Sequence, residues 1–460
     1  MFASIFCVAF LWATLTVAAS NRYAQGRALI SCYNIVLGLF FIYFALPSAL
    51  LLALNGGAYV WIPWLGGNSE IAITALVCAI SVAAFSLGYM PSFRRGQPFG
   101  DPLPMKRQEL AALGMIVAGV ALKIYAFNAS GSLEQNLMRL SSGIRDTMEI
   151  DAVASHLIAL KNLSGVADAG ATWLLIERIR QRRHIAIWGV LFASILLLTY
   201  LSTGKRLYIL WPILGAILAT HYYVKPIQVR KAPVIVLAVL GLGFTTLMAR
   251  IYLPAFMADV EIDLTTVEWA NGSILKFYFF SLEFSTYEFL TLAIYESDQV
   301  VSFWGSRIEA FYVTNIEPLF YFVPRMLWPD KPLQFYDMSH AYRTVVMGGS
   351  LGDGGGIAAT IVGTSWSLGG GMGMLATSIV LGMWCRRIDS TPGYRFNPSA
   401  LSVCWYAYWI MVIFHFFRQG TIGWTGIIVV FQHSGMLLGL AALQTLRRTP
   451  VAGRNDGNGS

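Results

Sequence analysis

Charged residues are scarce in this 460-residue chain, at 12% of the total, whereas 56% of the residues are hydrophobic. A soluble domain needs more charge than this on its surface, so the composition excludes an ordinary soluble protein. The basic residues lie in short clusters between apolar runs and form no continuous stripe, so the pI near 9.2 does not indicate a nucleic-acid partner. The mean hydropathy of +0.60 is typical of a membrane protein.

Cysteine is also rare and poorly placed for metal or redox chemistry. None of the five cysteines has a partner at CxxC or another metal-ligand spacing: Cys7, Cys32, Cys78, Cys385 and Cys404. We therefore expect no disulfide framework, no metal site and no cofactor. The first apolar run, 2–19, has no basic residue before it, so it is predicted to be a retained first helix and not a cleaved signal.

Long apolar runs are abundant. Each has about 17 to 25 residues, enough to cross about 30 Å of hydrocarbon as a helix. They predict an all-α, polytopic integral membrane protein with about eleven transmembrane helices, within a range of about ten to thirteen. The runs are 2–19, 31–54, 70–90, 109–127, 152–176, 184–201, 207–223, 233–249, 357–384, 399–417 and 423–445.

The loops between these runs alternate in their content of lysine and arginine. By the positive-inside rule, the basic loops are cytoplasmic and the others face outward. The outward loops are 55–69, 128–151, 202–206, 250–356 and 418–422. The predicted regions are transmembrane helices in 1–249, a large outward segment 250–356 with interfacial or re-entrant helices near 272–295 and 309–324, further transmembrane helices in 357–448, and a cytoplasmic tail 449–460.

Several basic residues lie on the outward side, where the positive-inside rule does not explain them. Arginine suits a polyanionic head group, because its fork of donors matches phosphate oxygens and stays charged. The alternative is that each is a solvated or snorkelling surface charge. Three of them are held at the membrane edge, where charges tend to be functional: Lys205 and Arg206 in a short turn, and Arg418 at the end of a span, with His415 on the same helical face.

The stretch 322–332 reads FVPRMLWPDKP, and its three prolines make a rigid mount for Arg325, Asp330 and Lys331 beside Trp328. In a long outward loop of a polytopic protein, PRMLWPDKP resembles the signature of the oligosaccharide repeat-unit polymerases, the Wzy-type O-antigen polymerases. The glycine-rich stretch 363–370 is similar to the helix that follows this loop in that family, and TGKR and FFRQG resemble its basic turns. The family often has an acidic residue at the position of Thr364.

The resemblance implies a metal-independent membrane glycosyltransferase of the GT-C type in the bacterial inner (cytoplasmic) membrane, with a periplasmic active face. Such an enzyme transfers a growing glycan from undecaprenyl pyrophosphate to an incoming lipid-linked repeat unit, in the synthesis of lipopolysaccharide O-antigen, exopolysaccharide or a related polymer. The implied partners are undecaprenyl pyrophosphate-linked oligosaccharide, membrane lipid, a chain-length regulator and a flippase.

This reaction needs positive charge at the leaving pyrophosphate and, if it inverts the anomeric centre, a general base. The residues expected to bind pyrophosphate or glycan are Lys205, Arg206, Arg250, Arg325, Lys331, Arg343, Arg418 and Trp328. The expected catalytic residues are Asp330, His340 and Glu283, with Asp337, Asp353 and Glu288 as alternatives.

Three other functions stay open. An O-antigen ligase shares the general architecture and the donor, although the PRMLWPDKP motif favours a polymerase. A flippase of lipid-linked oligosaccharide would usually show internal repeats and midplane charges, whereas Lys123 and Lys161 are the main charges at membrane depth. A non-catalytic scaffold predicts that replacing Arg325 or Arg418 with alanine leaves polymer production intact.

Overall fold

The computed structural model describes residues 31–55, 59–65, 67–89, 106–129, 152–203, 206–225, 286–322, 337–348, 358–390, 398–427 and 433–448, with a few isolated positions besides. Every regular element within these ranges is a helix. The all-α prediction is therefore confirmed for this part of the chain.

Six of the described helices are long and apolar enough to cross a membrane. They are Cys32–Leu52, Ser69–Tyr89, Lys106–Ala129, Ile185–Ser202, Thr360–Ser390 and Ala400–Gln419. Two shorter apolar helices span Tyr208–Val224 and Ser434–Leu446. The chain is thus a polytopic, membrane-embedded protein by helix length and composition. The predicted span 2–19 and nearly all of 233–249 lie outside the described residues.

The predicted span 152–176 is not a single helix. Helix α7 (Ala152–Leu163) ends and α8 (Val166–Gln181) begins on either side of a turn at Ser164 and Gly165. The Ser164 hydroxyl donates a hydrogen bond to the carbonyl oxygen of Lys161 at 2.6 Å, a local contact that competes with a regular helix. Hydropathy alone does not register such a turn, and the prediction of one continuous helix is wrong here.

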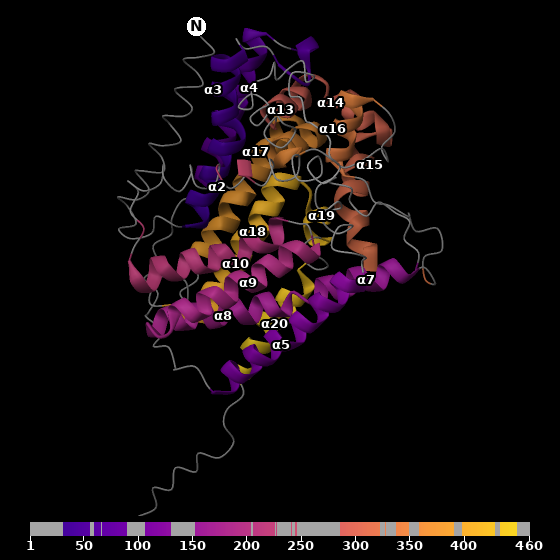
Figure 1. Ribbon diagram of the computed structural model, residues 1–460. Coiled ribbons are helices and arrows are strands. Elements are labelled where there is room, and N and C mark those ends of the chain that lie inside the picture. Colours follow the sequence, from indigo (N-terminus) through magenta and orange to yellow (C-terminus); the bar gives the residue numbers. More distant parts are fainter. Residues whose placement is uncertain are drawn as a thin grey trace, which may run out of the picture.

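The long helices form two groups that are inclined to one another (Figure 1). The first group contains α2 (Cys32–Phe40), α3 (Leu46–Asn55), α4 (Asn68–Tyr89), α13 (Thr286–Tyr295) and α17 (Thr360–Ser390). The second contains α5 (Lys106–Ala129), α8, α9 (Ile185–Thr203), α10 (Arg206–Ala219) and α20 (Ser434–Arg448). Helix α18 (Ala400–Gln419) packs against helices of both groups and so connects the first group to the second.

The outward segment 250–356, predicted to hold interfacial or re-entrant helices, contains several short helices in its described part. After α13 come α14 (Ser297–Val301), α15 (Arg307–Phe311), a π-helical turn (Tyr312–Ile316), a 3-10 segment (Glu317–Phe322) and α16 (Met338–Met347). The short helix α19 (Ile422–Ile427) packs on this segment, where the backbone N–H of Ile422 donates to Asn315 Oδ1 at 2.9 Å. None of these short elements is among the candidate membrane spans.

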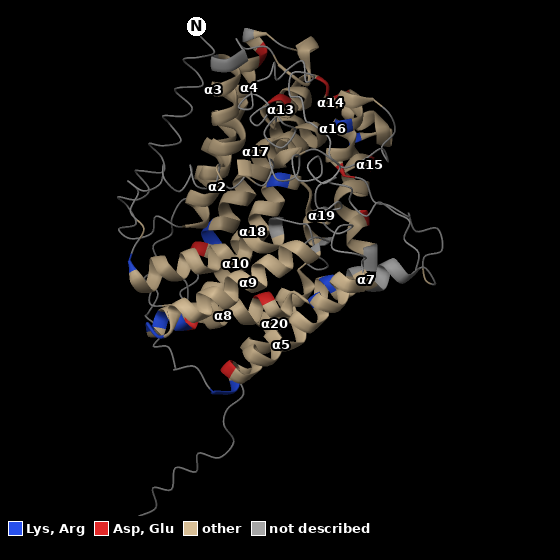
Figure 2. Ribbon diagram, viewed as in Figure 1, with Lys and Arg blue, Asp and Glu red and all other residues tan. Residues whose placement is uncertain are grey.

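Apolar side chains cover the outer faces of the long helices. Ile73, Leu76 and Ile80 are exposed on α4, and Ile187 and Val190 are exposed on α9. Their spacing of three or four residues places each set on one helical face. Charged residues are few along the middle of these helices (Figure 2). Such continuous apolar faces are stable when they contact lipid.

One carboxylate connects four helices. Asp389, near the end of α17, accepts hydrogen bonds from the backbone N–H groups of Cys32 (2.9 Å) and Tyr33 (3.3 Å) at the start of α2. The hydroxyls of Tyr89 on α4 (2.9 Å) and Tyr406 on α18 (2.6 Å) also donate to it. A carboxylate satisfies the free N–H groups at a helix start and interacts favourably with the helix dipole.

Helices α4 and α17 approach each other through small residues. Ser81 and Ser378 share a hydrogen bond of 2.8 Å. A Cβ atom on Gly88 would collide with the carbonyl oxygen of Ile379, and one on Gly382 would collide with that of Phe85. Glycine at both positions therefore allows backbone contact, as is common between membrane helices.

This packing predicts that Gly382→Ala lowers the melting temperature of the protein in detergent by several degrees, because the added methyl group meets a backbone oxygen that cannot move aside. Gly369→Ala on the same helix is the matched control, since Gly369 has open space at its Cβ position. Equal melting temperatures for the two variants would contradict the close α4–α17 contact.

Candidate functional site

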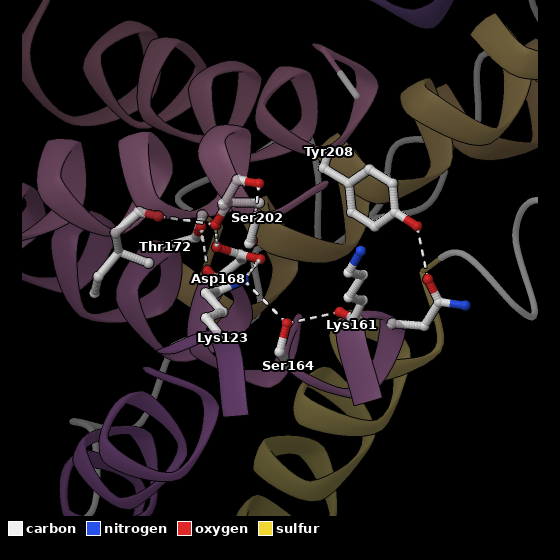
Figure 3. A network of polar contacts seen from close by, with 10 residues as sticks. Lys123, Lys161, Ser164, Asp168, Thr172, Ser202 and Tyr208 are labelled. Carbon is white, nitrogen blue, oxygen red and sulfur yellow. Dashed lines mark hydrogen bonds and ion pairs between the residues drawn. The ribbon is translucent and has the colours of Figure 1, made fainter. Parts of the chain in front are cut away.

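Lys123 of α5 and Asp168 of α8 form a buried ion pair (Figure 3). Their Nζ and Oδ2 atoms lie 2.9 Å apart, and the two side chains are 1% and 0% exposed. Thr199 of α9 donates its hydroxyl to the other carboxylate oxygen at 2.7 Å, and Lys123 Nζ also reaches Ser164 Oγ at 3.4 Å. Charges removed from water need such a set of partners. The pair therefore fixes α5, α8 and α9 relative to one another.

Polar contacts continue from this ion pair to the first turn of α10. Tyr208 donates its hydroxyl to Asn162 Oδ1 at 2.8 Å, and Asn162 lies in α7, two residues before Ser164. The side chain of Lys161 reaches from α7 toward Tyr208 (Figure 3). We call the set Lys123, Asn162, Ser164, Asp168, Thr199 and Tyr208 the polar network.

Two histidines connect the polar network to α18. His433 Nε2 lies 3.4 Å from His415 Nε2, and the His433 ring centroid lies 5.0 Å from that of Tyr208. Both histidines are buried. Helix α10 begins at Arg206, and Arg418 follows His415 by one helical turn. The ends of α10 and α18 that carry predicted basic residues therefore lie on either side of His433.

A second polar cluster lies where α18 ends. We call Thr364 of α17 together with Arg418, Gly420 and Thr421 the α18 junction. Gly420 ends α18 with a φ of 76°, and a Cβ atom there would collide with Thr364 Oγ1 and with the carbonyl oxygen of Thr360. Thr360 itself has a φ of 57°, which is strained for a β-branched residue. Only glycine at 420 allows this contact between α17 and the end of α18.

Helix α16 reaches the same junction. The hydroxyl of Tyr342 donates to the carbonyl oxygen of Gly363 at 3.1 Å and shares a hydrogen bond of 2.7 Å with Ser367. Arg343, the next residue on α16, is half-buried. Helix α16, which carries Arg343, therefore packs against the glycine-rich stretch of α17. The same stretch contacts Gly420 at the end of α18, two residues after Arg418.

Most of the other sequence-predicted site residues lie outside the described residues: Glu283, Asp330, Lys205, Arg250, Arg325, Lys331, Trp328 and the alternative Asp353. For Arg206 the backbone is described, as the first residue of α10, but the side chain is not. Their roles stay predictions.

His340 and Asp337 form a capping box at the start of α16. The backbone N–H of His340 donates to Asp337 Oδ1 at 3.3 Å, and the backbone N–H of Asp337 donates to His340 Nδ1 at 3.3 Å. His340 Nδ1 also lies 2.7 Å from Asp337 Oδ1. This arrangement stabilises the helix start. A carboxylate bound to one ring nitrogen also orients a catalytic histidine, so the catalytic role of His340 stays a prediction.

Glu288, an alternative general base, anchors a loop. Its Oε2 atom accepts hydrogen bonds from the backbone N–H groups of Val60 at 2.9 Å and Trp61 at 2.7 Å. Burial raises the pKa of the Glu288 carboxyl to about 7, although the N–H groups of Trp61, Val60 and Ile62 act in the opposite direction. These contacts indicate that Glu288 holds the 59–62 loop against α13.

The sequence reasoning missed Asp168, Tyr208 and His433. A signal for Asp168 was present, because an acidic residue inside the apolar run 152–176 needs a cationic partner, and Lys123 lies at similar depth in another run. Nothing in the sequence indicates that the polar residues 208 and 433 lie beside each other.

Comparison with protein-family models, with curated proteins and with solved structures finds no match for this chain. Among the residues that the structure describes, no three His, Cys, Asp or Glu side chains are grouped to hold a metal ion.

Replacing one member of the buried ion pair should be more harmful than replacing both. Lys123→Met leaves the Asp168 charge without its partner and should cost about 3–5 kcal/mol of stability. The double variant Lys123→Met with Asp168→Leu removes both charges and should recover part of this loss. Thermal unfolding in detergent measures the single variants Lys123→Met and Asp168→Leu and the double variant; strictly additive losses would contradict the pairing.

The raised pKa of Glu288 predicts a pH effect on stability. The folded pKa of about 7 exceeds the unfolded value of 4.5, so the contribution of this group is complete below the unfolded pKa and is lost as the pH rises through 7. Between about pH 5 and about pH 8 the protein should therefore lose up to about 3 kcal/mol relative to Glu288→Gln, whose amide does not titrate. Melting temperatures measured in detergent at both pH values test this; parallel pH profiles would refute it.

Proposed function

We propose that this protein is a polysaccharide polymerase that transfers a growing glycan from undecaprenyl pyrophosphate to an incoming lipid-linked repeat unit. The acceptor hydroxyl oxygen would form a bond to the anomeric carbon of the donor glycan. The bond from that carbon to the pyrophosphate oxygen would break, and the hydroxyl proton would pass to a base. The leaving pyrophosphate gains negative charge, which fixed cations stabilise.

The observation that best supports this proposal is the position of two basic helix ends. Helix α10, which starts at Arg206, and helix α18, which carries Arg418, meet across His433 and the buried polar network. Both ends lie where the lysine and arginine pattern predicts the outward membrane surface. A lipid-linked pyrophosphate sits at such a surface, with its glycan in water and its lipid chain in the bilayer.

The PRMLWPDKP motif supplies the second support. It resembles the polymerase signature, and it precedes α16 and the glycine-rich start of α17, both of which contribute to the α18 junction. We extend the proposal to the finer features of that family: about eleven transmembrane helices, a GT-C-like arrangement, location in the bacterial inner membrane and a periplasmic active face.

The test is direct synthesis by the purified protein. In liposomes that contain only the cognate undecaprenyl pyrophosphate-linked repeat unit, the protein should produce a ladder of longer glycans without added nucleotide sugar or metal. A flippase or a scaffold would produce none, and a ligase would require a different acceptor. Absence of a ladder with authentic substrate would overturn the proposal.

Arg418→Ala should reduce polymer formation by at least about a hundredfold, because a charged donor to the transition state is lost. Arg307→Ala is the matched control, since Arg307 belongs to the same predicted outward side but forms an exposed ion pair with Asp298. Gel electrophoresis of the lipid-linked products measures both variants. Equal activity of the two variants would remove Arg418 from the site.

A further inference from the structure

The α18 junction contains buried polar groups that no described residue satisfies. Thr364 Oγ1 and Thr421 Oγ1 have no hydrogen-bond partner in the described part of the chain, although the two residues are only 1% and 0% exposed. His415 Nδ1, one turn below Arg418, is a third such atom. Buried polar groups in folded proteins are nearly always paired. Two such hydroxyls beside the same glycine, Gly420, therefore need a common explanation.

The two hydroxyls belong to one small region. Thr364 packs against Gly420, and Thr421 follows Gly420 directly. Arg418, two residues before Gly420, is half-buried and makes no hydrogen bond or ion pair with any residue in the described ranges. Two neutral donors and one cation thus lie at a single helix end. A ligand that satisfies all three must offer several acceptor oxygens and negative charge.

We infer that the hydroxyls of Thr364 and Thr421, together with Arg418, bind the diphosphate group of the lipid-linked substrate. This inference rests on the proposed function and adds the two threonines to the residues expected at the leaving group. Diphosphate oxygens accept hydrogen bonds from hydroxyls and pair with guanidinium, so they match the chemistry of the junction. Glycine at 420 allows Thr364 to lie against the end of α18.

Binding of undecaprenyl diphosphate to the full-length protein in phosphatidylcholine nanodiscs tests the inference. Thr364→Val and Thr421→Val remove each hydroxyl with little change in shape, and each should weaken binding by at least about tenfold. Thr364→Ser and Thr421→Ser keep the hydroxyl and should restore binding. Thr377→Val is the matched control on α17, because the Thr377 hydroxyl already donates to the carbonyl oxygen of Gly373 at 2.8 Å.

A second readout separates ligand binding from a structural role. Since each hydroxyl is buried without a described partner, its replacement by a methyl group should leave the melting temperature of the ligand-free protein unchanged or raise it. A structural hydroxyl would instead lower it. Unchanged binding by both valine variants, or a lower ligand-free melting temperature that serine restores, would overturn the inference.

Two further arms identify the ligand chemistry. Inorganic diphosphate should compete with undecaprenyl diphosphate, whereas phosphatidylglycerol added to the nanodiscs should not. Competition by phosphatidylglycerol alone would assign the junction to a lipid phosphate and overturn the diphosphate assignment. If binding depends on the two hydroxyls but no glycan ladder forms, the polymerase proposal is refuted and the diphosphate site remains. If a ladder forms but binding does not depend on the hydroxyls, the polymerase proposal remains and the diphosphate site is refuted.

Discussion

The ion pair between Lys123 and Asp168 is the interaction on which the second helix group depends. Both side chains are buried in a protein that is mostly apolar, so neither charge is tolerable without the other. The pair links α5 to the first turn of α8, and Thr199 adds α9. Because α8 also contacts α10, α18 and α20, this arrangement determines where Tyr208 and the two histidines meet.

The same requirement for pairing operates in the first helix group. Asp389 accepts hydrogen bonds from two backbone N–H groups and two tyrosine hydroxyls, and Glu288 accepts from the backbone of the 59–62 loop. The α18 junction differs from these carboxylates. It places two hydroxyls that lack a partner among the described residues beside a half-buried arginine. Buried polar groups are usually paired, and two unpaired hydroxyls beside a cation are the basis of the inferred diphosphate site.

Hydropathy predicted the helical membrane class and six of its long helices to within a few residues, because crossing a bilayer imposes a minimum length of apolar sequence. It did not predict the break at Ser164 and Gly165, since two small residues change mean hydropathy very little. Arg418 was singled out from its position at a helix end. In the sequence, Thr364 is distinguished only by its departure from a family pattern and Thr421 by nothing, because an unpaired hydroxyl cannot be recognised without its neighbours.

The sequence by itself determined the membrane class, the helical secondary structure and the scarcity of charge at membrane depth, because these follow from local composition and from the cost of exposing peptide groups to lipid. The tertiary structure alone decided which polar residues meet. Lys123 and Asp168 are 45 residues apart in the chain. His415 precedes α19 in the chain and His433 follows it, yet their rings lie side by side. Thr364 of α17 contacts Gly420 at the end of α18. Such contacts depend on how helices pack, and helix packing is a property of the whole fold.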